Sequence, residues 1–431
     1  MEIIKYPQRQ DWENLTKRAL ADEAEEVSRT VSDIISRVRA EGDKALLDYE
    51  RRFTGAALSD LKVTDREMAD AETLVTENLR QAIVTAAENI ARFHKAQAMK
   101  EPVRVATAPG IVCEQRALPV DRVGLYIPGG NSPLFSTVLM LAVPAKIAGC
   151  REVTLCTPPR SDGSIHPAIL FAARTAGVNN IYKTGGAQAI AAMAYGTQSV
   201  PKVDKIFGPG NRFVMEAKQQ VSRNATAIDM PAGPSEVLVI ADDSANPEFV
   251  AADFLSQAEH GPDSQSILLT TSPRLAEQLP EVIDRMLDSL PRCEMMKKSL
   301  NHSRIILFAD DDEMMEFSNT YAPEHLILNH SRAESLCGQV RNAGSVFIGE
   351  WSPESVGDYA SGTNHTLPTS GYARAYSGVN LDSFMKKITF QHLTRRGIEE
   401  IGPTVEIMAE NEDLMAHKLA VTLRLKEIKK L

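Results

Sequence analysis

Two series of short apolar segments, each alternating with helical patterns, constrain the fold of this 431-residue chain more than any other feature. The first series runs from about residue 120 to residue 230, and the second from about residue 235 to residue 350. Each apolar run, such as SEVLVIA at Ser235–Ala241, is followed by an amphipathic or alanine-rich stretch. Strands that alternate with helices predict parallel sheets covered on both faces. We therefore expect an α/β protein with two doubly wound sheets and with sites at the carboxyl ends of the strands.

Helical patterns precede and follow these two series, so helical extensions are expected at both ends of the chain. Near the start, apolar residues recur at three- and four-residue steps: Val27, Val31, Ile34, Ile35 and Val38. Beyond Phe384 the chain again has a helical pattern, and this segment is short for a domain of its own. The expected domains are an N-terminal arm (1–24), a discontinuous α/β domain (25–127 with 237–380), a second α/β domain (128–236) and a helical tail that reaches a partner subunit (381–431).

Composition and charge narrow the class of protein. Lys and Arg number 47 against 57 Asp and Glu, a formal charge of −10, which speaks against a nucleic-acid-binding protein. No apolar run approaches the roughly 18 residues of a membrane helix, and the first residues contain no apolar signal core. The five cysteines are odd in number and form no CxxC pair. We expect a cytoplasmic protein with reduced thiols and a small-molecule substrate.

A first group of polar side chains ends an amphipathic helix, in the segment SQAEHG at Ser256–Gly261. Gln257 and His260 are three residues apart and so leave the same helix face. Their oxygen and nitrogen atoms could bind a borderline metal such as zinc. The alternative is an ordinary helix end, with Gly261 as its cap and His260 favourably placed at the negative end of the helix dipole.

A second group is YAPEHL at Tyr321–Leu326. Pro323 fits the first turn of a helix, which would place Glu324 and His325 among unsatisfied N–H groups. Such a position favours ionised Glu and neutral His, the basic form of each, so the pair could serve two different protons. The alternative is that Glu324 is only a capping charge at the helix start.

Two further groups lie near the end of the chain. The glycine-rich segment VGDYASGTNH at Val356–His365 carries Asp358 and more polar side chains than a turn requires, although a turn is the alternative. Glu412 and His417 are five residues apart, so they share no helix face unless a helix starts between them. The alternative for this pair is a solvated amphipathic helix.

Neither the GxGxxG fingerprint nor a P-loop is present. Glycine-containing turns nevertheless follow apolar strands at Gly208–Asn211 and at Gly129, and they allow an anion site of another kind. A catalytic thiol at Cys113, Cys150 or Cys156 is a further alternative for aldehyde chemistry, but Cys150 and Cys156 lie in apolar segments and should be buried and inert.

In this order along the chain, six strings resemble the histidinol dehydrogenase family: GLYIPGG (124–130), FGPGN (207–211), DMPAGPSEVLV (229–239), SQAEHGPDSQ (256–265), YAPEHL (321–326) and VGDYASGTNH (356–365). The resemblance covers nearly the whole chain and implies that the two doubly wound domains are incomplete Rossmann-like domains. It implies NAD-dependent oxidation of L-histidinol to L-histidine through L-histidinaldehyde, the final step of histidine biosynthesis. It also implies one zinc ion per site and a homodimer in which the tail of one subunit completes the site of the other.

The resemblance assigns roles residue by residue. The implied zinc ligands are Gln257, His260, Asp358 and His417, a mixed nitrogen and oxygen set that suits zinc. The implied catalytic bases are Glu324 and His325. Substrate contacts would come from Ser235, Gln257, His260, His325, Asp358, Glu412 and His417, and NAD contacts from Tyr126, Gln188 and Asn211. The alternatives are a related NAD-dependent dehydrogenase of another small polar alcohol, a zinc hydrolase and a noncatalytic metal-binding protein.

Overall fold

The computed structural model describes residues 1–18, 24–129 and 132–430. Part of the expected N-terminal arm (1–24) and Gly130 of the GLYIPGG string lie outside these residues. The chain forms two compact units, the first made of Met1–Gln97 with Val120–Phe384 and the second of Ala98–Pro119 with Met385–Leu431. Each unit is described by itself.

The first unit contains a parallel sheet of five strands, in the order β6 (Asn180–Lys183), β5 (Glu152–Thr157), β4 (Arg122–Tyr126), β7 (Lys205–Phe207) and β8 (Ala227–Ile228). Numbered along the chain, this order is 3-2-1-4-5, which is the doubly wound arrangement. The strand order therefore reverses between β4 and β7, and the carboxyl end of that pair is where such sheets bind ligands.

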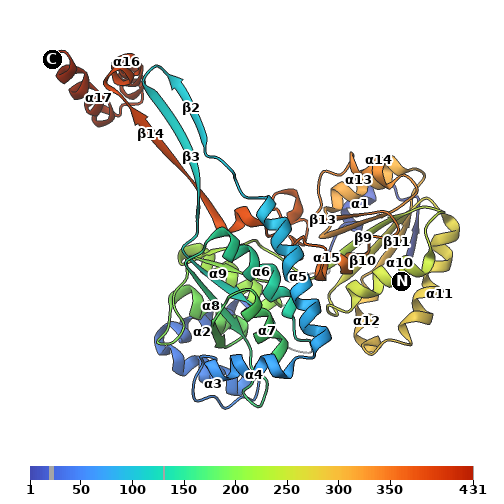
Figure 1. Cartoon of the computed structure of the whole chain (residues 1–431). Coiled ribbons are helices and arrows are strands. Elements are labelled where there is room, and N and C mark those ends of the chain that lie inside the picture. The colour runs from blue at the N-terminus through green and yellow to red at the C-terminus, as the bar shows by residue number, and fades with distance from the viewer. Residues whose placement is uncertain (19–23, 130–131, 431) are drawn as a thin grey trace. The chain divides into compact units, whose positions relative to one another are not determined.

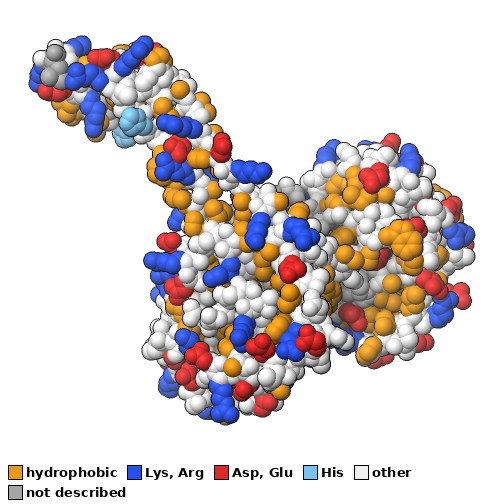
Figure 2. All heavy atoms as spheres, viewed as in Figure 1, with side chains coloured by type: hydrophobic (Ala, Val, Ile, Leu, Met, Phe, Trp, Pro, Cys, Tyr) orange, Lys and Arg blue, Asp and Glu red, His pale blue; other side chains and the backbone are white. Residues whose placement is uncertain are grey.

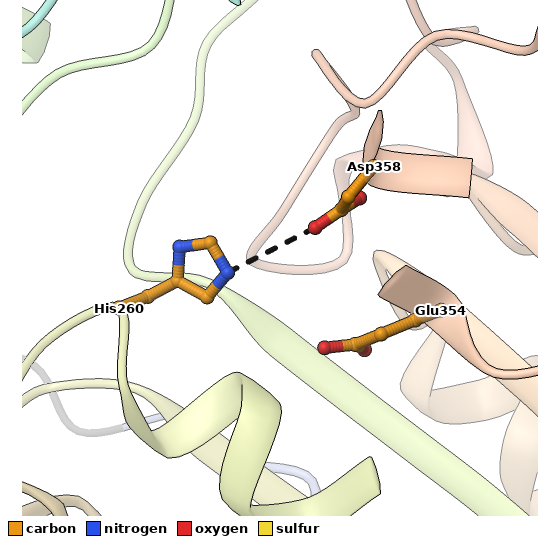
Figure 3. Close-up of side chains that lie close together, drawn as sticks. All are labelled: His260, Glu354 and Asp358. Carbon is orange, nitrogen blue, oxygen red and sulfur yellow. Dashed lines mark ion pairs between the residues drawn. The ribbon is translucent and has the colours of Figure 1, made fainter. Parts of the chain in front are cut away.

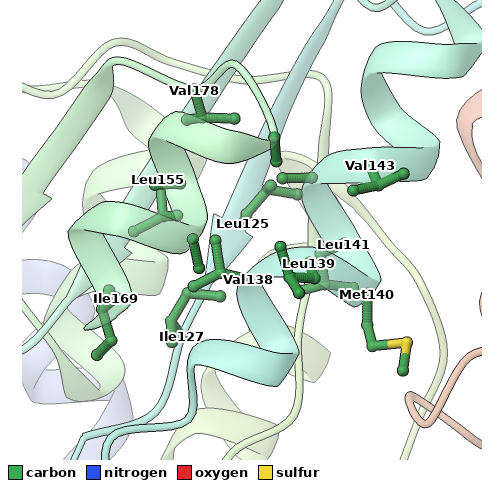
Figure 4. Close-up of a cluster of buried hydrophobic side chains, with 14 of the residues drawn as sticks. Leu125, Ile127, Val138, Leu139, Met140, Leu141, Val143, Leu155, Ile169 and Val178 are labelled. Carbon is green, nitrogen blue, oxygen red and sulfur yellow. The ribbon is translucent and has the colours of Figure 1, made fainter. Parts of the chain in front are cut away.

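Helices cover both faces of the five-stranded sheet because side chains alternate across each strand. On β4, Leu125 packs with α5 (Glu77–Ala96), α6 (Phe135–Ala148) and α7 (Pro167–Thr175), and Figure 4 shows this apolar cluster. Tyr126 faces the other cluster, which includes side chains of α2 (Ala24–Glu41), α3 (Asp43–Phe53), α8 (Gly186–Tyr195) and α9 (Arg212–Asn224). The helices between residues 24 and 97 thus pack on this sheet, whereas the expected boundaries grouped residues 25–127 with residues 237–380.

The first unit also contains a parallel sheet of six strands, in the order β1 (Glu2–Lys5), β11 (Arg304–Leu307), β10 (Gln265–Thr270), β9 (Glu236–Ala241), β12 (His325–Asn329) and β13 (Ser345–Ile348). Without β1, the order is again 3-2-1-4-5. One face packs on α10 (Pro247–Ala258), α11 (Pro273–Leu287) and α12 (Cys293–Leu300), and the other on α1 (Trp12–Leu15), α13 (Asp311–Tyr321) and α14 (Ala333–Cys337). The prediction of an α/β protein with two parallel sheets is confirmed (Figure 1).

The second unit consists of an antiparallel sheet and two helices. The sheet has the order β14 (Met385–Leu393), β3 (Ile111–Pro119) and β2 (Val103–Ala108), and α16 (Arg395–Asn411) and α17 (Met415–Ile428) follow it. The expectation that the tail is helical directly after Phe384 is wrong for its first nine residues. Ile388 and Phe390 alternate with polar residues along β14, a period of two that is typical of a strand.

Among the described residues, none of the helices combines the length and the hydrophobicity that a membrane-spanning segment requires.

Candidate active site

The predicted bases and most of the predicted ligands meet at the amino-terminal edge of the six-stranded sheet. Glu236 is the first residue of β9 and His325 the first residue of β12, and these neighbouring strands are in register with His325 opposite Val237. Gln257 comes from the last turn of α10 and Asp358 from α15 (Glu354–Tyr359). For this sheet the expectation of a site at the carboxyl ends of the strands is therefore wrong.

His325 lies on a strand, and the predicted helix start at Pro323 is wrong. The preceding helix α13 ends at Tyr321, and Ala322 takes a left-handed conformation with φ of 56° that closes it. Pro323 and Glu324 then lead directly into the buried run HLILN of β12. A continuous apolar run of this length is typical of a strand covered on both faces.

The His325 ring is buried among carboxylates. Its Nδ1 lies 3.2 Å from the carbonyl oxygen of Glu236, 3.7 Å from Glu324 and 4.0 Å from Glu354, and its Nε2 lies 3.4 Å from Asp358. Burial works against the charged ring, but the surrounding carboxylates, Glu324 foremost, raise the pKa of His325 to about 10.

Glu324 is also buried, and burial raises its pKa to about 8. Its Oε2 accepts a hydrogen bond of 2.8 Å from the backbone N–H of Glu236. The predicted helix start would have favoured ionised Glu324 and neutral His325. The structure has no helix there, and the carboxylates around the ring favour the charged form of His325.

An ion pair with the N-terminal segment anchors Glu236. Arg18 binds its carboxylate through two hydrogen bonds, Nε to Oε1 at 2.9 Å and a terminal nitrogen to Oε2 at 3.0 Å. Arg18 also donates to the carbonyl of Tyr321 at 2.7 Å and lies 3.7 Å from the centre of its ring, while the backbone N–H of Ser370 donates to Oε1 of Glu236 at 2.7 Å. Because the backbone of Glu236 contacts both predicted bases, fixing its side chain fixes their positions.

His260, Glu354 and Asp358 form a group that could hold a metal ion. One ligand atom from each residue lies within 4.8 Å of the others, and Nε2 of His260 is 3.9 Å from Asp358 (Figure 3). Oδ1 of Asp358 lies 3.4 Å from Nε2 of His325. Nε2 of His365 is buried without a hydrogen-bond partner among the described residues, so it is available to a ligand. Imidazole nitrogen with carboxylate oxygen is a donor set that suits zinc. The residues present therefore fit a zinc ion.

Asp358 lies on the short helix α15, so the turn that was the alternative for this segment is wrong at this residue. Burial favours its neutral form, but the neighbouring His325 ring prevails and lowers the pKa of Asp358 below its usual range. Glu354 precedes it by four residues and so shares its helix face. Sequence reasoning overlooked Glu354, although this spacing was a signal for it. Burial raises the pKa of Glu354 to about 8.

Gln257 is fully buried beside this group. With its amide oriented so that both polar atoms are satisfied, the nitrogen donates to Glu354 at 3.0 Å and the oxygen accepts from the N–H of Glu236 at 2.6 Å. Ser256 also donates to Glu354, at 2.8 Å. His365 faces the same site, and burial lowers its pKa to about 4, so it is a neutral imidazole near neutral pH. The sequence predicts no separate role for His365, which is only the last residue of the VGDYASGTNH string.

The remaining predicted substrate contacts fall in two places. Ser235 immediately precedes β9 and is half-buried, with its carbonyl accepting a hydrogen bond from the N–H of Gln265. Glu412 follows α16 in the second unit, and His417 lies in the first turn of α17, so a helix does start between them. Both side chains are exposed. Their meeting with the other predicted ligands stays a prediction.

The three predicted NAD contacts lie at the carboxyl edge of the five-stranded sheet. Tyr126 ends β4, Gln188 is in the first turn of α8, and Asn211 caps α9 with its side-chain oxygen. The Tyr126 hydroxyl accepts a hydrogen bond of 3.1 Å from the N–H of Gly186. Two helix starts beside the reversal of strand order match the general geometry of nucleotide sites in such sheets.

Gly208, which follows β7, shows how closely the backbone turns at this edge. Its φ is 129°, and a Cβ added there would lie 2.2 Å from the carbonyl oxygen of Tyr126. Only glycine fits such an approach. The residues at this edge therefore fit a dinucleotide without the GxGxxG fingerprint.

The two cysteines considered as nucleophiles are buried, as expected. Burial raises the pKa of Cys150 to about 11 and raises that of Cys156 as well. A thiol that resists ionisation is a poor nucleophile.

Comparison with known proteins gives one consistent result. The family model for histidinol dehydrogenase matches residues 17–425. The histidinol dehydrogenase of Bacteroides fragilis is 58% identical over 430 residues, covering 100% of both chains, and that of Escherichia coli K12 is 52% identical over 417 residues, covering 96% of this chain and 95% of the relative. The crystal structure of histidinol dehydrogenase from Elizabethkingia anophelis matches with a TM-score of 0.95 and 51% identity, covering 100% of this chain and 99% of that one. The chain therefore belongs to the histidinol dehydrogenase family, the zinc- and NAD-dependent enzymes of the final step of histidine biosynthesis.

Proposed function

We propose that Glu324 and His325 are the acid–base groups with which this histidinol dehydrogenase oxidises L-histidinol through bound L-histidinaldehyde to L-histidine. The observation that carries the proposal is the convergence of both side chains, buried and within 3.7 Å of each other, beside His260 and Asp358. Two adjacent groups that both titrate away from their usual range are typical of acid–base sites.

The two bases divide the reaction. In the first half, neutral His325 takes the hydroxyl proton of histidinol while a hydride passes to NAD, giving the aldehyde and NADH. In the second half, Glu324 takes a proton from the water that attacks the aldehyde, and a second hydride leaves the hydrated aldehyde with the help of His325. In total, the alcohol, one water and two NAD⁺ give the carboxylate, two NADH and three protons.

Gln257, His260 and Asp358 are the residues that would hold zinc in the first unit, with His417 as the fourth ligand. Zn²⁺ bound there would supply positive charge that grips the amino group and imidazole of the substrate and draws the Asp358 carboxylate away from His325. With less negative charge beside it, the His325 ring favours its neutral form, which is the form that accepts a proton. Holding the substrate at several points also keeps the reactive aldehyde in place between the two steps.

The enzyme is proposed to act as a homodimer in which the tail of one subunit supplies His417 and Glu412 to the site of the other. Large apolar side chains of the second unit are exposed, several by more than half: Val103, Val105, Ile407, Met408, Leu419 and Leu423. Figure 2 shows hydrophobic side chains among charged ones on the surface of this unit. Exposed large apolar side chains in this number are typical of a surface that another chain covers. All five cysteines are free, which supports the cytoplasm as the place of action.

The test follows NADH absorbance with L-histidinol as substrate, before and after zinc removal by a chelator. We expect two NADH per histidinol, loss of activity with loss of zinc by metal analysis, and recovery when zinc is restored. Full activity in demonstrably zinc-free enzyme would contradict the proposed ligand set. Accumulation of aldehyde with one NADH per histidinol would contradict the coupled two-step reaction.

A further inference from the structure

Glu50 is a buried carboxylate that the reaction above does not use. It lies on α3 of the first unit and is 0% exposed. Its Oε1 alone accepts three hydrogen bonds, from the hydroxyl of Thr184 at 3.0 Å, the N–H of Gly185 at 2.9 Å and Nε2 of Gln188 at 3.0 Å. Its Oε2 has no hydrogen-bond partner among the described residues.

All three donors belong to one short segment, the Thr184–Gln188 turn, which comprises the two residues after β6 and the first turn of α8 at the carboxyl edge of the five-stranded sheet. The same turn donates to the Tyr126 hydroxyl through the N–H of Gly186. It has little room to move, since a Cβ added to Gly185 would lie 2.5 Å from the side chain of Pro158. Two of the three proposed NAD contacts, Tyr126 and Gln188, are thus joined to Glu50 through one short turn.

A carboxylate is a costly group to place in this position. Burial raises the pKa of Glu50, although the bonds from Gly185 and Gln188 oppose this. Packing between α3 and α8 could be achieved by an apolar side chain without that cost of desolvation. An apolar side chain could not accept the hydrogen bond from the Gln188 nitrogen. With that nitrogen bound to Glu50, the amide oxygen of Gln188 lies on the other side of the amide group, near Gly186.

We propose that Glu50 is a positioning residue for the dinucleotide: one buried oxygen holds the Thr184–Gln188 turn and fixes the amide of Gln188 for contact with NAD. This inference rests on the proposed function, in which Gln188 and Tyr126 contact NAD. It concerns affinity for NAD and not the bases, because Glu50 contacts neither Glu324 nor His325.

The test compares Glu50 variants with a matched control on the same helix. Glu50→Gln keeps an acceptor at Oε1, so NAD affinity should stay within about threefold of the parent. Glu50→Ala removes the acceptor, and Glu50→Asp withdraws it by one methylene group. Both should weaken NAD binding by about tenfold or more, while KM for histidinol stays within about twofold. NAD binding is measured by calorimetry without histidinol, and the folded state by thermal unfolding.

Asp43→Ala is the control. Asp43 is the first residue of α3 and accepts two bonds from Ser199, at 2.5 and 3.2 Å. Ser199 follows the carboxyl end of α8, whereas Gln188 lies in the first turn of that helix. Asp43→Ala should lower Tm without changing NAD affinity. If Glu50→Ala does not fold, the comparison of Glu50→Asp with Glu50→Gln decides, and equal NAD affinity in these two variants would overturn the inference.

Gln188→Ala tests the proposed contact of Gln188 with NAD separately from the positioning role of Glu50. Weakened NAD binding in Gln188→Ala, together with parental affinity in Glu50→Asp and Glu50→Ala, would overturn the role of Glu50 alone. Parental NAD affinity in Gln188→Ala would overturn the proposed contact of Gln188 with NAD, and the positioning role with it.

Discussion

His325 shows how a single residue can depend on its neighbours for its chemistry. Three carboxylates lie within 4.0 Å of its ring, so in the protein alone the proton is held on the imidazole. A base must be free of that proton when it meets the substrate hydroxyl. Positive charge supplied beside Asp358 is the simplest way to release it, which links ligand binding to catalytic readiness.

The division of work between the two bases is tested by changing each one alone. Glu324→Gln should slow aldehyde oxidation by about 100-fold or more while sparing most of the alcohol oxidation, because general-base catalysis of water attack is lost only in the second half. His325→Asn should slow both halves by a comparable factor. The measurement is stopped-flow NADH formation from histidinol and, separately, from histidinaldehyde.

Equal losses in both half-reactions for Glu324→Gln would show that the assignment of Glu324 to water is wrong. Cys150→Ala serves as the control for the thiol alternative. It should keep near-parental rates in both halves, since Cys150 is buried and its pKa is raised to about 11.

The buried carboxyl group of Asp253 on α10 should make the free energy of unfolding depend on pH. Burial raises its pKa to about 7, against about 3.9 in an unfolded chain. Between these values the unfolded chain binds fewer protons, so the free energy of unfolding falls as the pH rises from about 4 to about 7. Asp253→Asn should therefore raise the free energy of unfolding at pH 8 by about 2–4 kcal/mol and change it little near pH 4.

Urea unfolding of the zinc-free protein at pH 4.5, 6 and 8 measures this effect. Asp284→Asn, an exposed position on α11, is the control and should change stability by little at any pH. A gain for Asp253→Asn that is the same at all three pH values would point to packing and not to the charge.

At the scale of the elements, the sequence was most informative where a pattern repeats. Alternation of apolar runs with helical stretches predicted both parallel sheets, and the three- and four-residue steps from Val27 to Val38 predicted the helix that the structure shows as α2. The proline at position 323 was misleading, because proline occurs both in the first turn of a helix and in an extended segment before a strand. The left-handed Ala322 that decides between them has no signature in the sequence, because φ above zero is unusual for alanine.

The candidate site was predictable in its residue types and not in its geometry. Glu324, His325, Gln257 and Asp358 were identified, and the structure brings them to one edge of the six-stranded sheet. That this edge is the amino-terminal one could not be predicted, because the usual site of such sheets lies at the other end. The anchoring contact of Arg18 with Glu236 joins residues 218 positions apart, and pairing over such a distance leaves no local pattern.

The N-terminal segment is expected to support catalysis through that contact. Arg18→Met leaves the buried Glu236 carboxylate unpaired, which should lower the free energy of unfolding by about 3–5 kcal/mol. It should also slow both half-reactions, because the backbone of Glu236 holds both bases. Chemical unfolding and the two half-reaction rates are the measurements.

The double variant Arg18→Met with Glu236→Gln separates the two effects. No charge is then left unpaired, so most of the stability should return, whereas the lost anchor should keep the rates low. Recovery of both stability and rates would show that Arg18 stabilises the fold without positioning the bases.

At the scale of the whole molecule, two sheets with the same 3-2-1-4-5 strand order carry different proposed sites at opposite edges. The five-stranded sheet offers its carboxyl edge to the proposed NAD site, and the six-stranded sheet offers its amino edge to the bases and ligands. Likeness of fold therefore did not determine likeness of function within this one chain. Function followed the particular side chains at each edge.

The shared site of the proposed dimer can be tested by mixing two inactive variants. His260→Ala removes a ligand of the first unit and His417→Ala a ligand of the second. A mixed dimer then contains one intact site if each site draws on both subunits, so a mixture refolded together should regain up to about a quarter of the parental activity, from half of the sites in the half of the dimers that are mixed. No recovery, with mixed dimers shown to form by mass spectrometry of differently tagged chains, would mean that each subunit completes its own site.

Strand β14 is joined to β3 along nine consecutive residue pairs, and the start of α16 touches the turn at Gly110, where a Cβ added to Gly397 would lie 2.4 Å from the carbonyl oxygen. The unit that carries His417 therefore also contains residues 98–119, which lie about three hundred positions earlier in the chain. Exchanging only the residues after Phe384 between two such enzymes would pair β14 of one enzyme with β3 of the other, and their contacts would no longer match. A chimaera should move both stretches together, and inherited changes near residue 110 should be matched by changes beyond residue 390.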